Sequence, residues 1–358
     1  MARAATATIN LDAIRHNYQL AKSVAPDQRA LAIIKANAYG HGAVNVANAL
    51  IDIADGFGVA CIEEAVELRE AGISLPILLL EGFFSADELD YISQHDLWCA
   101  VHSPSQIDII AKAELPRPIS IWLKMDSGMH RLGLQPAEFK TAFEKLNTLP
   151  QVKEVVLMSH FSSADEPELS VTAEQIKVFD AIAADLNAPV SLANSAGTMA
   201  HTEARRDWQR PGIMLYGASP FAQSQTIADQ LKPAMTLSSE VIAVRDLEPG
   251  DPVGYSSTWV CDKPTRVGTV AMGYADGYPR HAKNGTPVYV NGQPSRIIGR
   301  VSMDMLTVDL TEIPDAGIGS YVELWGENVL ASEVADCCDT IPYTLFTGIT
   351  RRVHKKYS

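Results

Sequence analysis

The chain has 358 residues, of which 47% are hydrophobic and 20% are charged, and this composition is typical of a globular protein with a large core. Its length exceeds that of most single domains, so we expect two domains. The 29 basic and 43 acidic residues give a formal net charge of −14, which argues against nucleic-acid and membrane-surface roles because phosphate backbones and anionic lipids are repelled.

The N-terminal segment MARAATATINLDAIRHNYQLAK predicts a short strand and then an amphipathic helix, without the long apolar core of a signal peptide. The most hydrophobic stretch, LPILLLEGFF at 75–84, is far too short to cross a bilayer. The five cysteines are an odd number and include no CxxC motif, which argues against a disulfide framework and a zinc site. We therefore expect a soluble protein of the reducing cytoplasm.

The first two thirds of the chain alternate between short apolar runs and helical patterns. The apolar runs are 31–36, 56–60, 76–80, 97–101, 120–126, 155–161, 189–195 and 212–217, and the candidate helices between them include 62–72, 85–96 and 136–149. Apolar runs without strict alternation indicate parallel strands that are covered on both faces. Eight of them in succession predict a TIM-like (β/α)8 barrel. An open doubly wound sheet is the alternative, but GFGVAC at 56–61 lacks the third glycine of a dinucleotide-binding fingerprint.

The pattern changes after about residue 232. The stretches TLSSEVIAV, TRVGTVAMGY, TPVYVNG and MDMLTVDL alternate with period two, and PG, NG and GQP turn signals separate them. This alternation, interrupted by turns, predicts an antiparallel β domain. We expect the barrel to occupy residues 8–232 and the β domain residues 233–358, with the N-terminal strand at 1–7 joining the β domain.

Polar residues gather at the carboxyl ends of the predicted barrel strands, where barrels of this kind place catalytic groups. They are Lys35, Tyr39, Lys124, Asp126, Arg131, His160, Asn194, Ser195 and Arg210. Crowding by apolar neighbours and other cations favours the neutral amine of Lys35, and a neutral amine can attack an aldehyde to form a Schiff base. The alternative is a lysine that extends from the strand end into solvent.

Eight segments, in order along the chain, resemble the motifs of alanine racemases. They are AIIKANAYGHGA (32–43), LKMDSGMHRLG (123–133), MSHFSSAD (158–165), NSAG (194–197), RPGIMLYG (210–217), VGYSSTW (253–259), GYADGYPR (273–280) and GRVSMDM (299–305). The resemblance implies a fold-type III enzyme that binds pyridoxal 5'-phosphate in its barrel. It also implies a homodimer with shared active sites, in which the two subunits are arranged head to tail.

The resemblance assigns roles to individual residues. Lys35 would hold the cofactor as a Schiff base, and Arg131 would contact both the phenolic oxygen of the cofactor and the substrate carboxylate. His160 would stack on or orient the cofactor ring and its arginine partner. The phosphate would bind Tyr39, Ser195 and the backbone amides of Gly212 and Ile213. The full set of cofactor-binding positions matches Lys35, Tyr39, Arg131, His160, Asn194, Ser195, Arg210, Gly212, Ile213 and Tyr343.

Arg210 stands where most pyridoxal enzymes have a carboxylate that protonates the pyridine nitrogen. An arginine keeps its own proton, so it donates a hydrogen bond to the ring without readily protonating it. The carbanion is then less stabilised and shorter lived, which suits an enzyme that only removes and returns one α-proton. The alternative is a surface arginine in a salt bridge before a Pro-Gly turn.

Racemisation most directly requires two acid/base groups, one on each face of the planar carbanion. Lys35 would serve one face, and Tyr255 in VGYSSTW matches the family's second base, which the partner subunit contributes. A tyrosine needs nearby cations or hydrogen bonds to act near neutral pH. The alternative for Tyr255 is a packing role in a β segment.

Supporting positions follow from the same resemblance. Met303 matches a backbone contact to the substrate carboxylate, and its alternative is core packing. Lys124 matches a lysine that is often carbamylated. Residues that match the access corridor are Asp165, Tyr274, Arg280 and Arg300. The chain departs from the family near its end, where Thr347 aligns with a tyrosine that lies close to the phosphate and Tyr343 stands four residues earlier.

The sequence thus predicts an alanine racemase-like enzyme that supplies D-alanine for peptidoglycan or takes part in D-alanine catabolism. A racemase or decarboxylase with broader specificity on the same fold is an alternative, and so is a cofactor-binding regulator without catalysis. The histidines other than His160 lack metal-ligand spacing, so we expect no metal site.

Overall fold

Eight parallel strands form one sheet in the computed structural model, which describes residues 3–358. They are β2 (Arg29–Ile33), β3 (Gly56–Val59), β4 (Ile77–Leu79), β5 (Leu97–Val101), β6 (Ile119–Lys124), β7 (Val152–Met158), β8 (Val190–Ser191) and β9 (Trp208–Gln209). The strands pair in the order β8-β7-β6-β5-β4-β3-β2-β9. Just beyond β9 and β8, the Arg210 amide donates to the carbonyl of Ala193 at 2.9 Å, which brings the two ends of the sheet together. The predicted barrel is therefore confirmed.

The predicted eighth strand at 212–217 is wrong, because these residues form the 3-10 turn η2 (Ile213–Tyr216) and the eighth strand is Trp208–Gln209. The run IMLY is entirely buried because it packs against the first helix of the barrel. A short apolar run that is buried on all sides has no period that separates a strand from a helical turn. The predicted seventh strand at 189–195 is likewise shorter, and Asn194 and Ser195 instead begin a helix.

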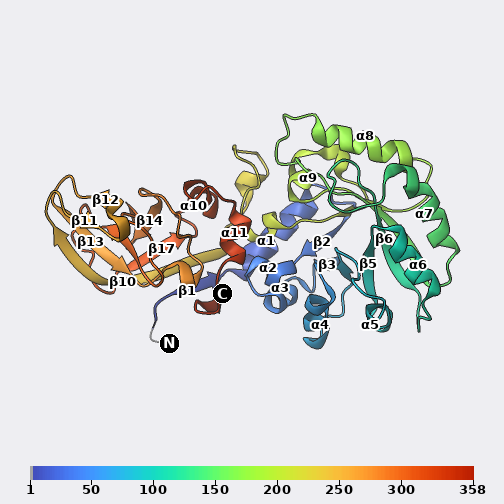
Figure 1. The fold of residues 1–358 in the computed structure, drawn as a ribbon, viewed down its shortest axis with the longest axis horizontal. Helices are drawn as coiled ribbons and strands as arrows, with labels where there is room; N and C mark the ends of the chain where they lie inside the picture. The colour runs from blue at the N-terminus through green and yellow to red at the C-terminus, as the bar shows by residue number, and fades with distance from the viewer. Residues whose placement is uncertain (1–2) are drawn as a thin grey trace.

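Helices cover the outside of the barrel (Figure 1). They are α1 (Leu11–Ser23), α3 (Ala43–Leu50), α4 (Ile62–Glu70), α5 (Glu88–Gln94), α6 (Pro104–Lys112), α7 (Pro136–Thr148), α8 (Val171–Ala183) and α9 (Ser195–Ala200), and the short turn α2 (Lys35–Tyr39) follows β2. The predicted helices at 62–72, 85–96 and 136–149 are confirmed, with earlier or later ends. The helix α5 begins late because the Glu88 carboxylate accepts the free amides of Phe84 and Ser85 at 2.9 Å each.

Tryptophan side chains fill the interior of the barrel. Trp122 is fully buried, and its ring lies 5.9 Å from that of Trp98 and 5.6 Å from that of Trp208. Trp98 and Trp208 stand near the amino ends of β5 and β9. The packed rings close this part of the barrel, so the carboxyl ends of the strands remain as the place for a site.

The second sheet is built around the long strand β10 (Met235–Leu247). Its order is β15-β14-β17-β10-β1-β18, and β13 and β16 pair beside β10. The other strands are β1 (Thr6–Ile9), β13 (Thr265–Val270), β14 (Pro287–Val290), β15 (Gln293–Arg296), β16 (Leu306–Asp309), β17 (Tyr321–Trp325) and β18 (His354–Tyr357). All pairs are antiparallel except β1 with β18, so the predicted antiparallel domain is confirmed.

The molecule is elongated, with the barrel at one end and the second sheet at the other (Figure 1). The hairpin of β11 (Pro252–Val253) and β12 (Trp259–Val260) lies toward the end far from the barrel. The helices α10 (Ala331–Cys337) and α11 (Pro342–Thr347) lie between, and α11 packs against α2 of the barrel. Over residues 3–358, no helix is both long and apolar enough to span a membrane.

Candidate active site

Lys35 follows β2 directly and begins α2, a turn whose backbone is left-handed. Residues 36–39, which are Ala, Asn, Ala and Tyr, have φ angles of 52°, 53°, 52° and 50°. This conformation costs an L-residue roughly 1–2 kcal/mol, so the turn as a whole costs several kcal/mol. Contacts from outside hold it: the Ala36 amide donates to Glu64 Oε1 at 2.6 Å, and the Ala43 amide donates to Asn37 Oδ1 at 2.8 Å. Strain that is maintained in this way is typical of functional sites.

Positive groups from three barrel strands, β2, β6 and β9, gather beside this turn. The Lys124 side chain is 6% exposed, and its pKa falls to about 8 because burial and then the charges of Arg210, Arg131 and Lys35 oppose its protonation. The pKa of His160 falls well below its usual value, first through burial and then through the same cations, so its imidazole is neutral. Four cationic side chains around one neutral histidine form a site for an anionic ligand.

Arg210 is the most deeply buried member of this cluster, with 3% of its surface exposed. Its guanidinium donates to the carbonyl of Ser159 at 2.6 Å, to Ser191 Oγ at 2.5 Å and to the carbonyl of Leu192 at 3.2 Å. It also lies 3.4 Å from His160 Nδ1. Burial lowers the pKa of Arg210 to about 10, which still leaves it charged at neutral pH. The alternative of a surface salt bridge is therefore wrong.

A group of hydrogen-bonding atoms comes together where α9 and η2 begin. The hydroxyl of Ser195 accepts from the amide of Gly212 at 2.8 Å and from that of Met214 at 3.3 Å. The Tyr39 hydroxyl lies so close to Gly212 that a Cβ added there would sit 2.8 Å from it. Backbone amides that converge in this way bind anions such as phosphate. The Asn194 side chain has a different task in this structure, because it caps α9 by accepting from Gly197 at 2.9 Å.

Tyr343 lies beside Tyr39 at this place, whereas Thr347 uses its hydroxyl within its own helix. The ring of Tyr343 lies 5.7 Å from that of Tyr39, and its pKa rises to about 12 through burial and then the charge of Asp165. The Thr347 hydroxyl is used within α11, where it donates to the Tyr343 carbonyl at 2.7 Å. The aromatic side chain is thus present one helical turn before the position expected by alignment, and Asp165 belongs to the same edge of the barrel.

The second group of predicted residues lies in the β domain. Tyr255 is 69% exposed and Met303 is 53% exposed, so the packing alternatives for both are wrong. Figure 1 places the β11–β12 hairpin that flanks Tyr255 far from α2 and Lys35. One chain therefore does not bring Tyr255 to its own Lys35.

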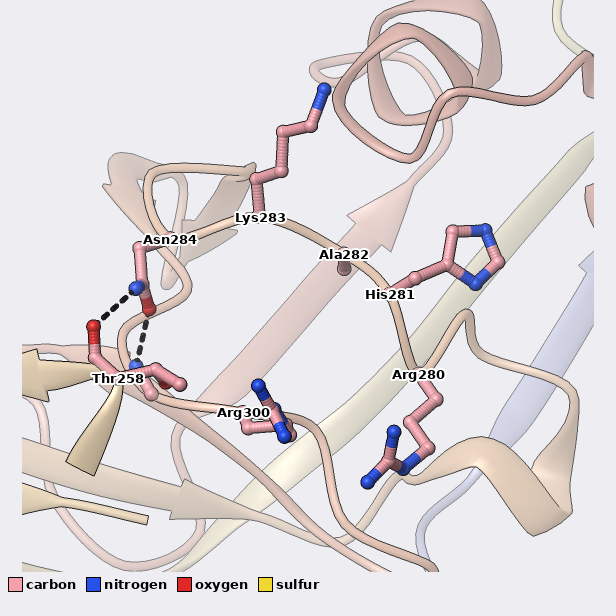
Figure 2. Close-up of a pocket in the computed structure, with 8 residues that line it drawn as sticks. Thr258, Arg280, His281, Ala282, Lys283, Asn284 and Arg300 are labelled. Atoms are coloured by element: carbon pink, nitrogen blue, oxygen red, sulfur yellow. Dashed lines mark hydrogen bonds between the residues drawn. The ribbon is translucent and has the colours of Figure 1, made fainter. Parts of the chain in front are cut away.

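Two cavities share Arg300 in their lining, and one of them also contains Tyr255. One of about 370 Å³ includes Tyr255, Arg300 and Met305 in its lining, and one of about 480 Å³ includes Arg280 and Arg300. Figure 2 shows the guanidinium groups of Arg280 and Arg300 on the same side of segment 280–284, with the Lys283 side chain on the other. The Arg300 Nη1 lies 3.4 Å from Ser256 Oγ in the turn η4 (Tyr255–Ser257).

Ion pairs among Arg3, Asp276 and Arg352, which the sequence did not reveal, hold the loops of Tyr274 and Met303, and we call them the ionic clamp. The buried carboxylate of Asp276, in the turn η5 (Tyr274–Asp276), accepts from Arg3 at 2.5 Å and pairs with Arg352 at 3.1 Å. Arg352 also donates to Asp304 at 2.7 Å, next to Met303. The clamp joins both ends of the chain to the loops of Tyr274 and Met303, and nothing in the spacing of these residues could have indicated it. Among residues 3–358 no three His, Cys, Asp or Glu side chains could together hold a metal ion.

Comparison with known proteins gives matches along the whole chain. Residues 9–220 match the family Alanine racemase, N-terminal domain, and residues 234–357 match Alanine racemase, C-terminal domain. The chain is 58% identical over 356 residues to the alanine racemase of Pseudomonas syringae pv. syringae (strain B728a), with 99% of each chain covered. It is 56% identical over 355 residues to the protein of Pseudomonas putida (strain KT2440) that is named Alanine racemase, catabolic, again with 99% of each covered. A crystal structure of biosynthetic alanine racemase from Pseudomonas aeruginosa covers 99% of both chains at 48% identity, with a TM-score of 0.96.

Proposed function

The chain belongs to the alanine racemase family of pyridoxal-phosphate-dependent isomerases, and we propose that it interconverts L-alanine and D-alanine with the cofactor held at Lys35. One observation carries the proposal: the lysine that follows β2 lies among buried cations, and Tyr39 of the same turn lies beside Gly212, whose amide donates to Ser195. The relatives include proteins named catabolic and a structure described as biosynthetic, so both D-alanine breakdown and peptidoglycan supply belong to the proposal.

The residues present fit pyridoxal 5'-phosphate. The phosphate suits the pocket of Ser195 and the amides of Gly212 and Ile213, with the hydroxyls of Tyr39 and Tyr343 beside it. The remaining negative charge of the cofactor suits the surrounding cations, of which Arg131 is the exposed one. When bound, the cofactor supplies an electron-withdrawing ring that makes the α-proton of the attached amino acid acidic. We keep Asn194 among the cofactor contacts as a prediction.

Three residues of the barrel would have separate roles in the reaction. The amine of Lys35, once substrate has displaced it, takes or returns the α-proton on one face. Arg210, which stays protonated at neutral pH, would donate a hydrogen bond to the ring nitrogen without protonating it, which would limit the electron-withdrawing power of the ring and suppress side reactions. Neutral His160, in contact with Arg210, orients the ring.

The second base would come from a second copy of this chain. The phenol of the partner subunit's Tyr255 would face Lys35 across the substrate, which requires a head-to-tail homodimer. The exposure of Tyr255 and its distance from α2 in a single chain support this arrangement. The barrel, residues 8–232, would then hold the cofactor, and the β domain, residues 233–358 with strand 1–7, would complete the site of the partner.

Other residues of the β domain would line the route to that shared site. The backbone of Met303, an exposed residue, would contact the substrate carboxylate, and Tyr274, Arg280 and Arg300 would form the access corridor with Asp165 of the facing barrel. We place the enzyme in the cytoplasm, since its cysteines are all free thiols, as is usual in a reducing compartment.

Lys124 is the proposed site of a carbamate. Its pKa of about 8 leaves a fraction of neutral amine at neutral pH, and a neutral amine adds to carbon dioxide to give a carbamate and one released proton. The change replaces a buried positive charge by a negative one among Arg131, Arg210 and Lys35. Attraction would then replace repulsion, and the carbamate could orient Arg131.

Subunit mixing tests the proposal. Lys35→Ala is expected to lose the visible absorbance of the cofactor and all formation of D-alanine from L-alanine, and Tyr255→Phe to lose most of its turnover. When the two variants are mixed and exchange subunits, about half of the dimers become hybrids with one intact site, so about a quarter of the wild-type activity should return.

Two controls accompany the mixing experiment. Lys35→Ala mixed with a differently tagged Lys35→Ala should recover nothing, and native mass spectrometry verifies the exchange. The shared site is refuted if verified hybrids stay inactive. The cofactor assignment is refuted if Lys35→Ala keeps the absorbance band and full turnover.

A further inference from the structure

His41 is a fully buried histidine at the end of the left-handed turn that begins at Lys35. Its Nδ1 lies 3.1 Å from the carbonyl oxygen of Ala38 and 3.0 Å from that of Tyr39. Two oxygen acceptors at one nitrogen require that nitrogen to carry the hydrogen. Burial lowers the pKa of His41 to about 3, so the ring is neutral and Nε2 carries no hydrogen. Within the part of the chain that the structure describes, Nε2 has no hydrogen-bond partner.

The same ring packs among the aromatic side chains beside Tyr39. The His41 ring stacks on Tyr216 with 4.4 Å between centroids, and the Phe346 edge meets it at 5.1 Å. Tyr216 in turn lies 4.8 Å from the ring of Tyr39 and donates its hydroxyl to the Ile33 carbonyl of β2 at 2.8 Å. A single imidazole therefore contacts both the backbone of the turn and the ring that packs against Tyr39.

These contacts bear on how the backbone carbonyls of the left-handed turn are hydrogen-bonded. The carbonyls of residues 36–38 each accept a backbone amide from residues 40–42, whereas within the described residues no backbone amide donates to the carbonyl of Tyr39. The Nδ1–H of His41 supplies the donor for the Tyr39 carbonyl and a second donor for that of Ala38. Because Tyr39 is itself left-handed, its side-chain direction depends on that backbone being held.

We propose that His41 is a positioning residue for the cofactor, whose Nδ1–H holds the left-handed turn so that Lys35 and Tyr39 both face the site. The inference rests on the proposed function, since it takes pyridoxal phosphate as the ligand. His41 touches neither the reacting atoms nor the phosphate pocket directly. Its Nε2 has no part in the role, which makes the two ring nitrogens experimentally separable.

The substitutions His41→Asn and His41→Gln distinguish the two ring nitrogens, because an Asn amide reaches the position of Nδ1 and a Gln amide reaches that of Nε2. Apo-protein of each variant is titrated with pyridoxal 5'-phosphate, and the visible absorbance reports the dissociation constant. We expect His41→Asn to bind within about threefold of wild type, and His41→Gln and His41→Phe to bind about tenfold or more weakly, as the loss of a buried hydrogen bond implies. His41→Phe keeps the stacking on Tyr216, so its deficit isolates the missing donor.

A matched control comes from His201, which is also buried and whose Nε2 lies 3.1 Å from the Ala164 carbonyl away from the turn. His201→Phe should lose thermal stability while its cofactor affinity stays that of wild type. If His41→Phe does not fold, the Asn and Gln pair alone decides. Equal affinities for His41→Asn and His41→Gln, or wild-type affinity in His41→Phe, would overturn the inference. The proposed function fails separately, through Lys35→Ala that keeps its absorbance band.

Discussion

Replacing Lys124 by methionine tests the balance of charge in the buried cluster. In the unfolded chain a lysine has a pKa near 10.5, and in the folded protein that of Lys124 is about 8. Each tenfold change is worth about 1.4 kcal/mol, so the charged form of Lys124 opposes folding by about 3 kcal/mol. Below pH 8 the lysine is charged in both states and the whole penalty applies. Between pH 8 and about 10.5 the folded protein releases the proton and the penalty disappears.

We therefore expect Lys124→Met to be more stable than wild type by about 3 kcal/mol at pH 7 in buffer free of carbon dioxide, and by little at pH 10. Urea unfolding of the cofactor-free protein, followed by circular dichroism, measures this difference. Lys140→Met is the control, since Lys140 is an exposed lysine on α7 of the same barrel. It should leave the stability unchanged at both pH values.

Bicarbonate adds a second arm to this experiment. If Lys124 forms a carbamate, added bicarbonate should stabilise wild type at neutral pH and leave Lys124→Met unaffected. The reasoning about charge is refuted if Lys124→Met is no more stable than wild type at pH 7 without carbon dioxide, or if the difference is the same at pH 7 and pH 10. The carbamate is refuted separately if bicarbonate acts equally on both proteins.

Three further outcomes can be measured. Gly212→Ala should weaken pyridoxal-phosphate binding about tenfold in an absorbance titration, because the new methyl would lie 2.8 Å from the Tyr39 hydroxyl. Unchanged binding would show that the Tyr39 side chain is free to move. Asp276→Asn should lower the free energy of unfolding, measured in urea, by about 1–3 kcal/mol. The loss is smaller than for a wholly buried ion pair because both arginine partners are about one-third exposed. A variant as stable as wild type would exclude the clamp. Met303→Ala should leave both the KM for alanine and the melting temperature close to those of wild type, because the proposed contact comes from the backbone and the residue is 53% exposed, and a large rise in KM would show that the side chain itself contacts the substrate.

Local pattern was enough to predict the barrel, the second sheet and most of the barrel residues of the site. Apolar runs separated by helices indicate parallel strands wherever they occur, and the carboxyl ends of those strands meet at one rim. Lys35, Lys124, His160 and Arg210 could therefore be grouped without coordinates. The run at 212–217 was misread because complete burial removes the period that distinguishes strand from turn.

Tertiary structure alone decided the contacts between residues far apart in the chain. The clamp of Arg3, Asp276 and Arg352 forms because β1 and β18 pair in parallel, which no local pattern records. Tyr343, which the sequence already places among the cofactor-binding candidates, lies beside Tyr39 because α11 packs on α2. The sequence by itself determined which elements form and which side chains stand at their ends, since both depend on neighbours along the chain. Which of those ends meet depends on how the elements pack, and the packing is decided by the burial of apolar surface over the whole molecule.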